Sequence, residues 1–376
     1  MPLVKPKTKA QIIAESRDNN FKNMDLSHAD FTGMDLCNAD FSHAILTGAN
    51  FTNVVASHAN FIGADLTDAV MVDAQMMAAC FTSAILDSAD LTEANFSGAD
   101  FIAANLKNTT MLNTDFDYAD LSGSRMQGSY VNGATFINAL MINTRLERCH
   151  YDESRTVLTY GLSCNLTEAD LSDANLTGLD LTRSGLDGAI FDEANLESAT
   201  IKGMQIDKAS FNRARLAYVD FTETNIQGLS AMGANLQNAI LTDAVLVDAI
   251  LIGAALTSID GQRVNLTNAV MDKCLLDYSD FTYGNFSKVS AIGITARSTN
   301  FIEAELFKTN FENADLHKAK FVSAYLGEAS FEDADLSGSD MSRCRLKDTI
   351  ATGANIRGAT INPKSRALLE CSGAIN

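Results

Sequence analysis

Residues 21–60 read FKNMDLSHADFTGMDLCNADFSHAILTGANFTNVVASHAN, and a large apolar residue occupies every fifth position from Phe21 to Phe51. The large positions from residue 21 to residue 51 are Phe21, Leu26, Phe31, Leu36, Phe41, Leu46 and Phe51. A small residue, usually Ala, stands two positions earlier, Asp or Asn stands one position earlier, and Ser or Thr commonly follows. The register continues to Ile361, which gives 69 in-phase positions, so one repeated unit builds nearly the whole chain.

A period of five fits neither an α-helix, with about 3.6 residues per turn, nor a flat strand, with a period of about two. It indicates a chain that bends after every fifth residue and always points the same two side chains inward. Phenylalanines also recur at intervals of 20 residues, which indicates four sides per turn. We therefore expect one set of rings to stack in the core: Phe21, Phe41, Phe61, Phe81, Phe101, Phe281, Phe301 and Phe321.

The unit Ala-(Asp/Asn)-(Leu/Phe)-(Ser/Thr)-X, repeated over residues 21–361, resembles the pentapeptide-repeat family. The resemblance implies an all-β fold, namely a right-handed quadrilateral parallel β-helix of about 17 coils with short terminal caps. The chain is similar to the long-rod members of that family, some of which are bacterial effectors injected into host cells.

Breaks in the repeat divide the chain into five expected segments: 1–20, 21–151, 152–165, 166–361 and 362–376. The first lacks the repeat and is expected to be an N-terminal arm with a helical cap, and the second and fourth are expected to be the two parts of the β-helix. In the third the pattern weakens but keeps its phase, which fits either an ejected loop or two degenerate repeats. In the last, Asn362 followed by Pro363 resembles the start of a helix, so a C-terminal cap is expected.

Composition excludes several classes of protein. The chain has 376 residues and a net charge of −19, with 47 acidic and 28 basic side chains, which argues against direct nucleic-acid binding. A hydrophobic content of 46% is too high for a disordered chain, and no apolar run is long enough to span a bilayer. The seven Cys are scattered and no signal peptide is evident, so we expect a cytoplasmic protein, or one exported into a host cell without a cleaved signal.

One cluster resembles a nucleophile or metal site, namely Cys149 and His150 with Asp152, Glu153 and Cys164 nearby. Both Cys occupy the small inward position of the repeat, and the spacing matches no ligand motif. We therefore predict no catalytic residue, no metal, no cofactor and no enzymatic activity.

Two surface features remain as candidates for an interaction surface. Residues 23–106 contain 11 acids and no Lys or Arg; Asp25, Asp35 and Asp65 represent this acidic stretch. Tyr118, Tyr218 and Tyr278 all occupy the outward X position, and they would share one face if every coil held 20 residues. Exposed tyrosines favour contacts with proteins.

These features support a non-enzymatic, rod-shaped scaffold for protein–protein interaction as the first hypothesis, with a bacterial effector that acts on host proteins as its finer form. Its partner is not identified by the sequence, and a homodimer through the C-terminal cap is a further expectation. The alternative is an acidic DNA mimic that binds type II topoisomerase (gyrase), as the resemblance to the quinolone-resistance branch of the family implies. The third hypothesis is an enzyme, but no catalytic site for it is found in the sequence.

Overall fold

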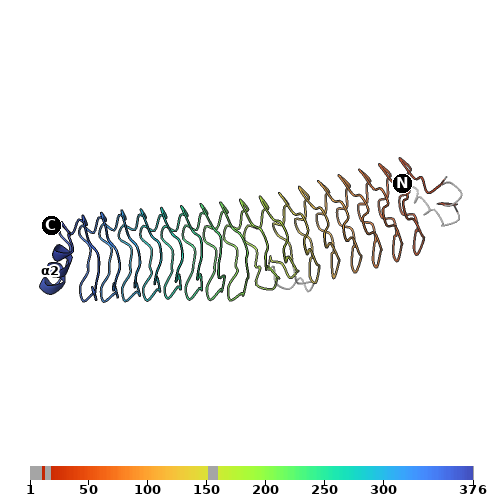
Figure 1. Cartoon of the computed structure of the whole chain (residues 1–376). Coiled ribbons are helices and arrows are strands. Elements are labelled where there is room, and N and C mark those ends of the chain that lie inside the picture. Colours follow the sequence, from red (N-terminus) through yellow and green to blue (C-terminus); the bar gives the residue numbers. More distant parts are fainter. Residues whose placement is uncertain (1–10, 13–17, 151–159, 376) are drawn as a thin grey trace. The chain divides into compact units, whose positions relative to one another are not determined.

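The computed structural model describes residues 11–12, 18–150 and 160–375, and the chain divides into two compact units, Met1–Ile190 (unit 1) and Phe191–Asn376 (unit 2). Within each unit the chain winds into a coil whose successive turns stack on one another (Figure 1). Unit 2 also contains the helix α2 (Pro363–Cys371). None of the helices among the described residues is both long and apolar enough to cross a membrane.

The corner at Asp25–Ala29 explains the residue types of the repeat. Leu26 is buried, and its carbonyl oxygen accepts a hydrogen bond of 3.0 Å from the Ala29 amide. Between them His28 has a φ of 59°, the left-handed value that the third residue of such a turn adopts. The Asp25 carboxylate accepts the amide of Ser27 at 3.1 Å. Asp or Asn therefore precedes the large residue because its side chain stabilises the next corner.

Successive turns pair through isolated parallel bridges. Asp25 pairs with Ile45, and Ile45 pairs with Asp65, so equivalent residues are 20 positions apart. Four bridged residues occur in each such turn, one on each side, which makes each unit a four-sided coil. Each side contributes one bridged residue rather than a longer strand. We call residues related by these bridges a column; neighbours in a column lie about 4.8 Å apart.

Stacked phenylalanine rings fill the core of unit 1. The rings of Phe21 and Phe41 are 4.5 Å apart and 8° from parallel, and Phe41 and Phe61 are 4.9 Å apart. Phe31 comes from the opposite side of the coil and meets the ring of Phe41 edge-on at 5.5 Å. In unit 2 Phe281, Phe301 and Phe321 stack in the same way, at 5.5 and 5.2 Å. The alanines of the small position are buried beside these rings, where a larger side chain would overfill the coil.

One turn of unit 1 is longer than its neighbours. Thr135 pairs with Asn165, which is 30 residues later rather than 20, and Leu140 and Asp170 do the same. Two degenerate repeats would have kept the spacing at 20, so this turn contains ten additional residues. His150 and Tyr160 form an antiparallel bridge at its base. Most of the predicted loop, residues 152–159, lies outside the described residues.

The ends of the chain differ in how much is described. At the C-terminus Asn362 is the N-cap of α2, and its side chain accepts the Ser365 amide at 2.9 Å. Leu369 is buried against the last turns, whereas Leu368 is exposed. At the N-terminus Ile12 is buried, but most of the predicted arm over residues 1–20 lies outside the described residues.

Candidate interaction surfaces

The two Cys of the predicted cluster, Cys149 and Cys164, lie in the buried interior of the coil. The Cys149 side chain is buried and donates a hydrogen bond of 3.1 Å to the carbonyl oxygen of Met126. Burial raises the pKa of Cys149 and raises that of Cys164 to about 12, so both thiols stay protonated. Neither of these buried Cys residues therefore supplies a thiolate nucleophile. Asp152 and Glu153, the predicted neighbours, lie outside the described residues.

His150 belongs to a ladder of rings on the outside of unit 1. Its ring lies 5.1 Å from that of Tyr130 and 5.2 Å from that of Tyr160. Desolvation lowers the pKa of His150, which favours the neutral imidazole. Among the residues that the structure describes, no group of three or more His, Cys, Asp or Glu side chains is placed to hold a metal ion.

The three representative acids have a role in the backbone. Asp25, Asp35 and Asp65 each accept the amide of the residue two positions later, at 3.1 Å in every case. The hydrogen bond from the Cys37 amide lowers the pKa of Asp35. Asp25 and Asp65 share a column, while Asp35 lies on a different side of unit 1. The acidic stretch is therefore distributed around the coil rather than gathered on one surface.

The three predicted tyrosines are exposed: Tyr118 by 67%, Tyr218 by 55% and Tyr278 by 68%. Tyr218 and Tyr278 are 60 residues apart within unit 2, where bridges keep a spacing of 20, so they occupy one corner three turns apart. Tyr118 belongs to unit 1, where one turn has ten additional residues. The assumption of 20 residues in every coil, on which a common face for all three depended, is therefore wrong.

Two residues near Tyr278 were missed by sequence reasoning. Tyr283 is 54% exposed at the next corner of the same turn, and Leu275 is 46% exposed on the preceding side. The Tyr283 hydroxyl lies 3.4 Å from a carboxylate oxygen of Glu303. Tyr283 occupies the same X position as Tyr278 and could have been found from the repeat. We call Leu275, Tyr278 and Tyr283 the tyrosine patch.

A group of cations lies on one side of unit 1. Lys107, Arg125, Arg145 and Arg148 are all of the Lys and Arg residues between positions 23 and 150. Asn105, Arg125 and Arg145 are successive members of one column, and the other two cations lie at the corner that follows it. The sequence alone did not show this grouping, because it depends on the arrangement of columns.

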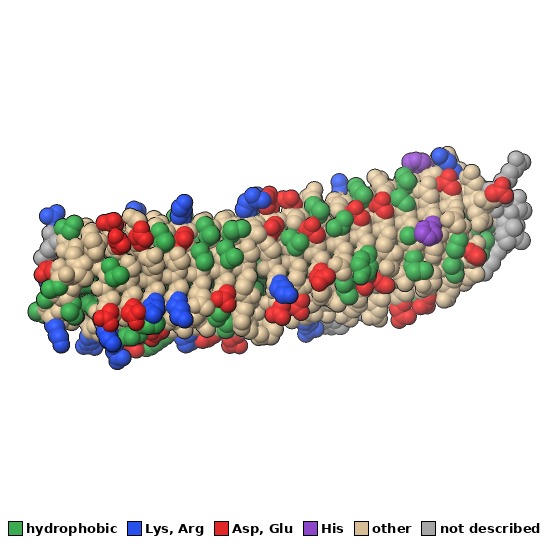
Figure 2. Space-filling model, in the orientation of Figure 1, with side chains coloured by type: hydrophobic (Ala, Val, Ile, Leu, Met, Phe, Trp, Pro, Cys, Tyr) green, Lys and Arg blue, Asp and Glu red, His purple; other side chains and the backbone are tan. Residues whose placement is uncertain are grey.

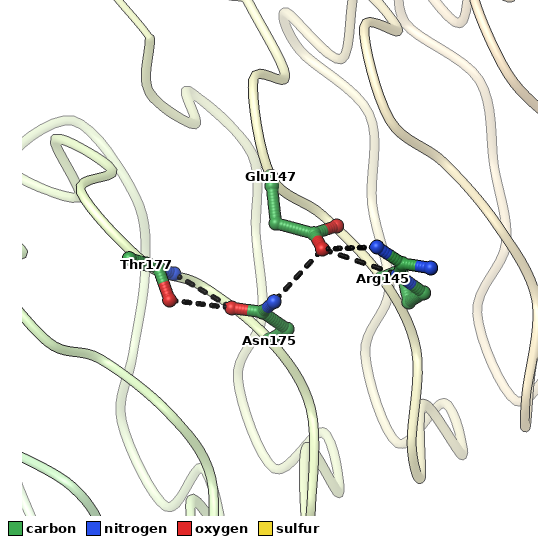
Figure 3. A network of polar contacts seen from close by, with 4 residues as sticks. All are labelled: Arg145, Glu147, Asn175 and Thr177. Atoms are coloured by element: carbon green, nitrogen blue, oxygen red, sulfur yellow. Dashed lines mark hydrogen bonds and ion pairs between the residues drawn. The ribbon is translucent and has the colours of Figure 1, made fainter.

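Arg145 is held in place by a network of polar contacts (Figure 3). Its guanidinium donates to Glu147 Oε1 at 3.1 and 2.9 Å, and Asn175 Nδ2 donates to the same oxygen at 2.8 Å. Asn175 Oδ1 in turn accepts the Thr177 amide at 3.1 Å. The network thus connects the cationic side to the turn that follows the ten additional residues.

A groove of about 530 Å³ runs along this corner. It is lined by Lys107, Asn108, Gln127, Gly128, Arg145, Glu147 and Arg148. Two buried acceptors, Gln127 Oε1 and Glu147 Oε2, have no hydrogen-bond partner among the described residues. Since buried polar atoms are usually satisfied, the groove is suited to a polar guest.

Comparison with known proteins agrees with this architecture. The sequence model of the family described as pentapeptide repeats matches most of the chain. The matched residues are 20–53, 44–82, 57–93, 94–133, 164–203, 232–260, 285–321, 297–333 and 329–362. No curated protein matches the chain.

Several solved structures are similar to the chain at low identity. A trypsin-treated form of QnrB1, a plasmid-mediated fluoroquinolone resistance protein, is 18% identical, covers 53% of this chain and 100% of its own, and has a TM-score of 0.30. HetL, from the cyanobacterium Nostoc, is involved in heterocyst differentiation regulation; it is 18% identical, with coverages of 95% and 100% and a TM-score of 0.15. A protein of the Arabidopsis thaliana thylakoid lumen is 28% identical over 35% of this chain and 79% of its own, with a TM-score of 0.13.

Proposed function

The chain belongs to the pentapeptide-repeat family, whose fold is a right-handed quadrilateral β-helix, and from this premise we propose that it is a non-enzymatic solenoid that binds other proteins. The observation that carries the proposal is the tyrosine patch of unit 2. Solenoids present extended surfaces that are suited to binding, and their function depends on surface detail rather than on the fold.

The backbone of Tyr278 and Tyr283 supports a role for these residues other than the stability of the corner. Their φ values are 62° and 61°, in the left-handed region that Gly and Asn adopt far more easily than an aromatic residue. A bulky residue in that region costs about 1–2 kcal/mol. Since both side chains are more than half exposed, little burial within the chain offsets this cost. Contact with another protein is the explanation that we propose.

The tyrosine patch has the composition of an interface centre. Tyrosine is enriched at binding hot spots because its ring supplies contact area while its hydroxyl forms hydrogen bonds. On the face drawn in Figure 2, hydrophobic side chains lie scattered among charged ones rather than in one continuous sheet. Such a surface suits a partner that is bound reversibly, since permanent interfaces are larger and more apolar.

Affinity capture with substituted proteins tests this function. Tyr278→Asn and Tyr283→Asn are suitable because Asn tolerates a positive φ, so the corners should be preserved. Tyr118→Asn in unit 1 is the matched control, with the same repeat position and a similar exposure. We expect the purified chain to enrich at least one protein from a cell extract, the double variant to lose it and the control to retain it. Enrichment that is equal for the double variant and the original chain contradicts the proposal.

The finer form of the proposal is that the partner is a host-cell protein and that this chain acts as an exported bacterial effector. Its support is the resemblance to long members of the family. Capture from eukaryotic and bacterial extracts in parallel tests it, because an effector should enrich its partner from the eukaryotic extract alone.

The acidic stretch supports an alternative function, mimicry of DNA toward type II topoisomerase. Residues 23–106 carry 11 acids without a Lys or Arg, a local charge density comparable with that of a short duplex. Against it, the acids are spread over the four sides of the coil, and a cationic side follows them along unit 1. A gyrase supercoiling assay separates the two functions: a DNA mimic inhibits or protects the enzyme at micromolar concentration, whereas the protein-binding solenoid leaves it unaffected.

A further inference from the structure

One side of unit 1 changes the sign of its charge halfway along. This side consists of the column from Asp25 to Arg145 and the two turn residues that follow each member of the column; we call it the charge-split side. Its first four turns carry the acids Asp25, Asp65, Asp68 and Asp87 and no cation. Its next three turns carry the cations Lys107, Arg125, Arg145 and Arg148, with Glu147 as the one acid.

We propose that the charge-split side binds the same side of a second copy of this chain, with the two copies antiparallel. A two-fold axis perpendicular to the columns places each column opposite the same column of the other copy, and the two columns then run in opposite directions. The acidic half of each copy then faces the basic half of the other. Each contact occurs twice, as an isologous interface requires. The proposal uses unit 1 alone and does not depend on the tyrosine patch.

The charges select one register for this pairing. The axis passes between the turn that contains Asp87 and the turn that contains Lys107, so that Asp87 of one copy faces Lys107 of the other. In the same register Asp65 faces Arg125. Because both contacts occur twice, the interface contains four ion pairs and no like charges directly opposite.

Sliding one copy by a single turn, about 4.8 Å, loses this match. In one direction the axis passes through Asp87, which then faces its own copy, while Asp25 faces Arg145. In the other direction Lys107 faces its own copy, while Asp65 faces Arg145 and Asp68 faces Arg148. Each neighbouring register thus places like charges directly opposite on the axis, which is unfavourable, and the register described above is favoured because it contains no such contact.

Two corner glycines lie opposite longer side chains in this register. Asp68, an exposed corner residue, faces Gly128 in the groove lined by Lys107 and Arg148, beside the Asn108 side chain. Gly48 faces Arg148, and the ring of His28 lies over Gly48. The buried acceptor Gln127 Oε1 faces the turn of Thr67.

The association should be weak and sensitive to salt. Asp65 is partly exposed and Arg125 is exposed, and ion pairs of this kind contribute little each. Screening at high ionic strength should therefore dissociate the pair. Sedimentation velocity is the suitable measurement, at about 100 µM protein and at about 20 mM and about 500 mM salt, where exposed charges differ greatly in screening. We expect a mass approaching twice 40.4 kDa at low salt and the single-chain mass at high salt.

Charge reversal provides the decisive test. Arg125→Asp and Asp65→Arg each place like charges opposite one another twice, so each variant alone should associate at least about tenfold more weakly. In an equimolar mixture one variant contributes two acids and the other two cations, and the heterodimer should form as tightly as the original. Arg215→Asp is the matched control, at the same repeat position in unit 2 and also exposed.

Every result of this experiment bears on the proposal. Restored association in the mixture, together with an unchanged Arg215→Asp control, supports it. A single-chain mass for the original protein at low salt overturns it. Association that survives both reversals places the dimer elsewhere, for example at the C-terminal cap, and also overturns it, as does a mixture that fails to associate. Asp65→Asn keeps an acceptor for the Thr67 amide and shows by circular dichroism that loss of charge does not unfold the turn.

Discussion

The hydroxyl of Ser279 donates a hydrogen bond of 2.6 Å to the carbonyl oxygen of Leu256, one turn earlier in unit 2. The same contact, from the small position to a carbonyl 23 residues back, recurs at Thr224, Cys274, Thr299 and Thr309. It lets a small polar residue replace Ala inside the coil, because the polar atom finds a partner in the adjacent turn. One small polar residue lacks this hydrogen bond. Ser339 is buried at the same repeat position, but its hydroxyl has no hydrogen-bond partner among the described residues.

This difference predicts opposite effects for one substitution. Ser279→Ala removes the bond to Leu256 and also the acceptor of the Ile259 amide at 3.2 Å, so it should lower the free energy of unfolding by about 1–2 kcal/mol. Ser339→Ala removes an unsatisfied buried hydroxyl and should be neutral or stabilising. Urea unfolding of the two variants measures the difference. Equal losses in both would show that these bonds do not contribute to stability.

Removal of one ring from the phenylalanine stack should be costly. Phe41 lies between Phe21 and Phe61 and also meets Phe31 and Phe51 edge-on. Phe41→Ala should therefore leave a cavity and cost about 3–5 kcal/mol. Since solenoid turns depend on their neighbours, amide hydrogen exchange should accelerate most in the turns next to Phe41.

Phe307→Ala is the control for this substitution. Phe307 is the one phenylalanine outside the large repeat position, and its ring contacts that of Tyr325 at 5.9 Å on the surface. Its truncation should cost below about 1 kcal/mol, as for a surface residue. If the two substitutions accelerate exchange equally, the stacked rings are not the main source of stability.

The five-residue period predicts most of the coil because it fixes which side chains point inward. Phe21 and Phe41 are 20 residues apart in sequence, and their bridged neighbours, Asn20 and Asp40, are paired. The longer turn between Thr135 and Asn165 could not be located in this way, because any insertion that is a multiple of five preserves the phase. Since such an insertion changes which residues share a column, the sequence could not predict whether Tyr118 shares a face with other tyrosines.

Surface residues were predicted less completely than the core. Asp25 was expected only as part of an acidic surface, whereas its carboxylate also accepts the Ser27 amide and closes a corner. Leu275 was missed because its position in the repeat is usually polar, so no periodic signal marks an apolar residue there. The charge-split side becomes visible only when residues 20 positions apart are compared across seven turns.

The reactivity of the thiols should follow their burial. Burial raises the pKa of Cys274 and Cys344 to about 12, and Cys344 donates its hydrogen to the carbonyl oxygen of Phe321 at 2.8 Å. Because the thiolate is the reactive form, both should react slowly with iodoacetamide at about pH 8. Cys371 at the end of α2 is exposed and should be alkylated first. Mass spectrometry of the native and the urea-unfolded protein measures this; rapid labelling of Cys274 in the native protein would refute the assignment.

Acid should weaken the turn that contains His150. Desolvation lowers the pKa of His150 below its usual value of 6.5, so the unfolded chain binds a proton more readily than the folded chain. The stability that the neutral imidazole provides is complete above pH 6.5 and is lost as the pH falls from 6.5 through the lower pKa of the folded state. We expect the melting temperature to fall in this window.

A variant that cannot titrate isolates the contribution of His150. His150→Phe keeps a ring between Tyr130 and Tyr160 and removes the ionisable group, so the melting temperature of this variant should depend less on pH below 6.5. His58→Phe, at an exposed corner of the same unit, should retain the dependence of the original chain. If His150→Phe leaves the slope unchanged, the acid sensitivity of the coil arises from other groups. A reduced slope in this variant alone identifies protonation of the stacked imidazole as the cause, since the ring contacts are otherwise preserved.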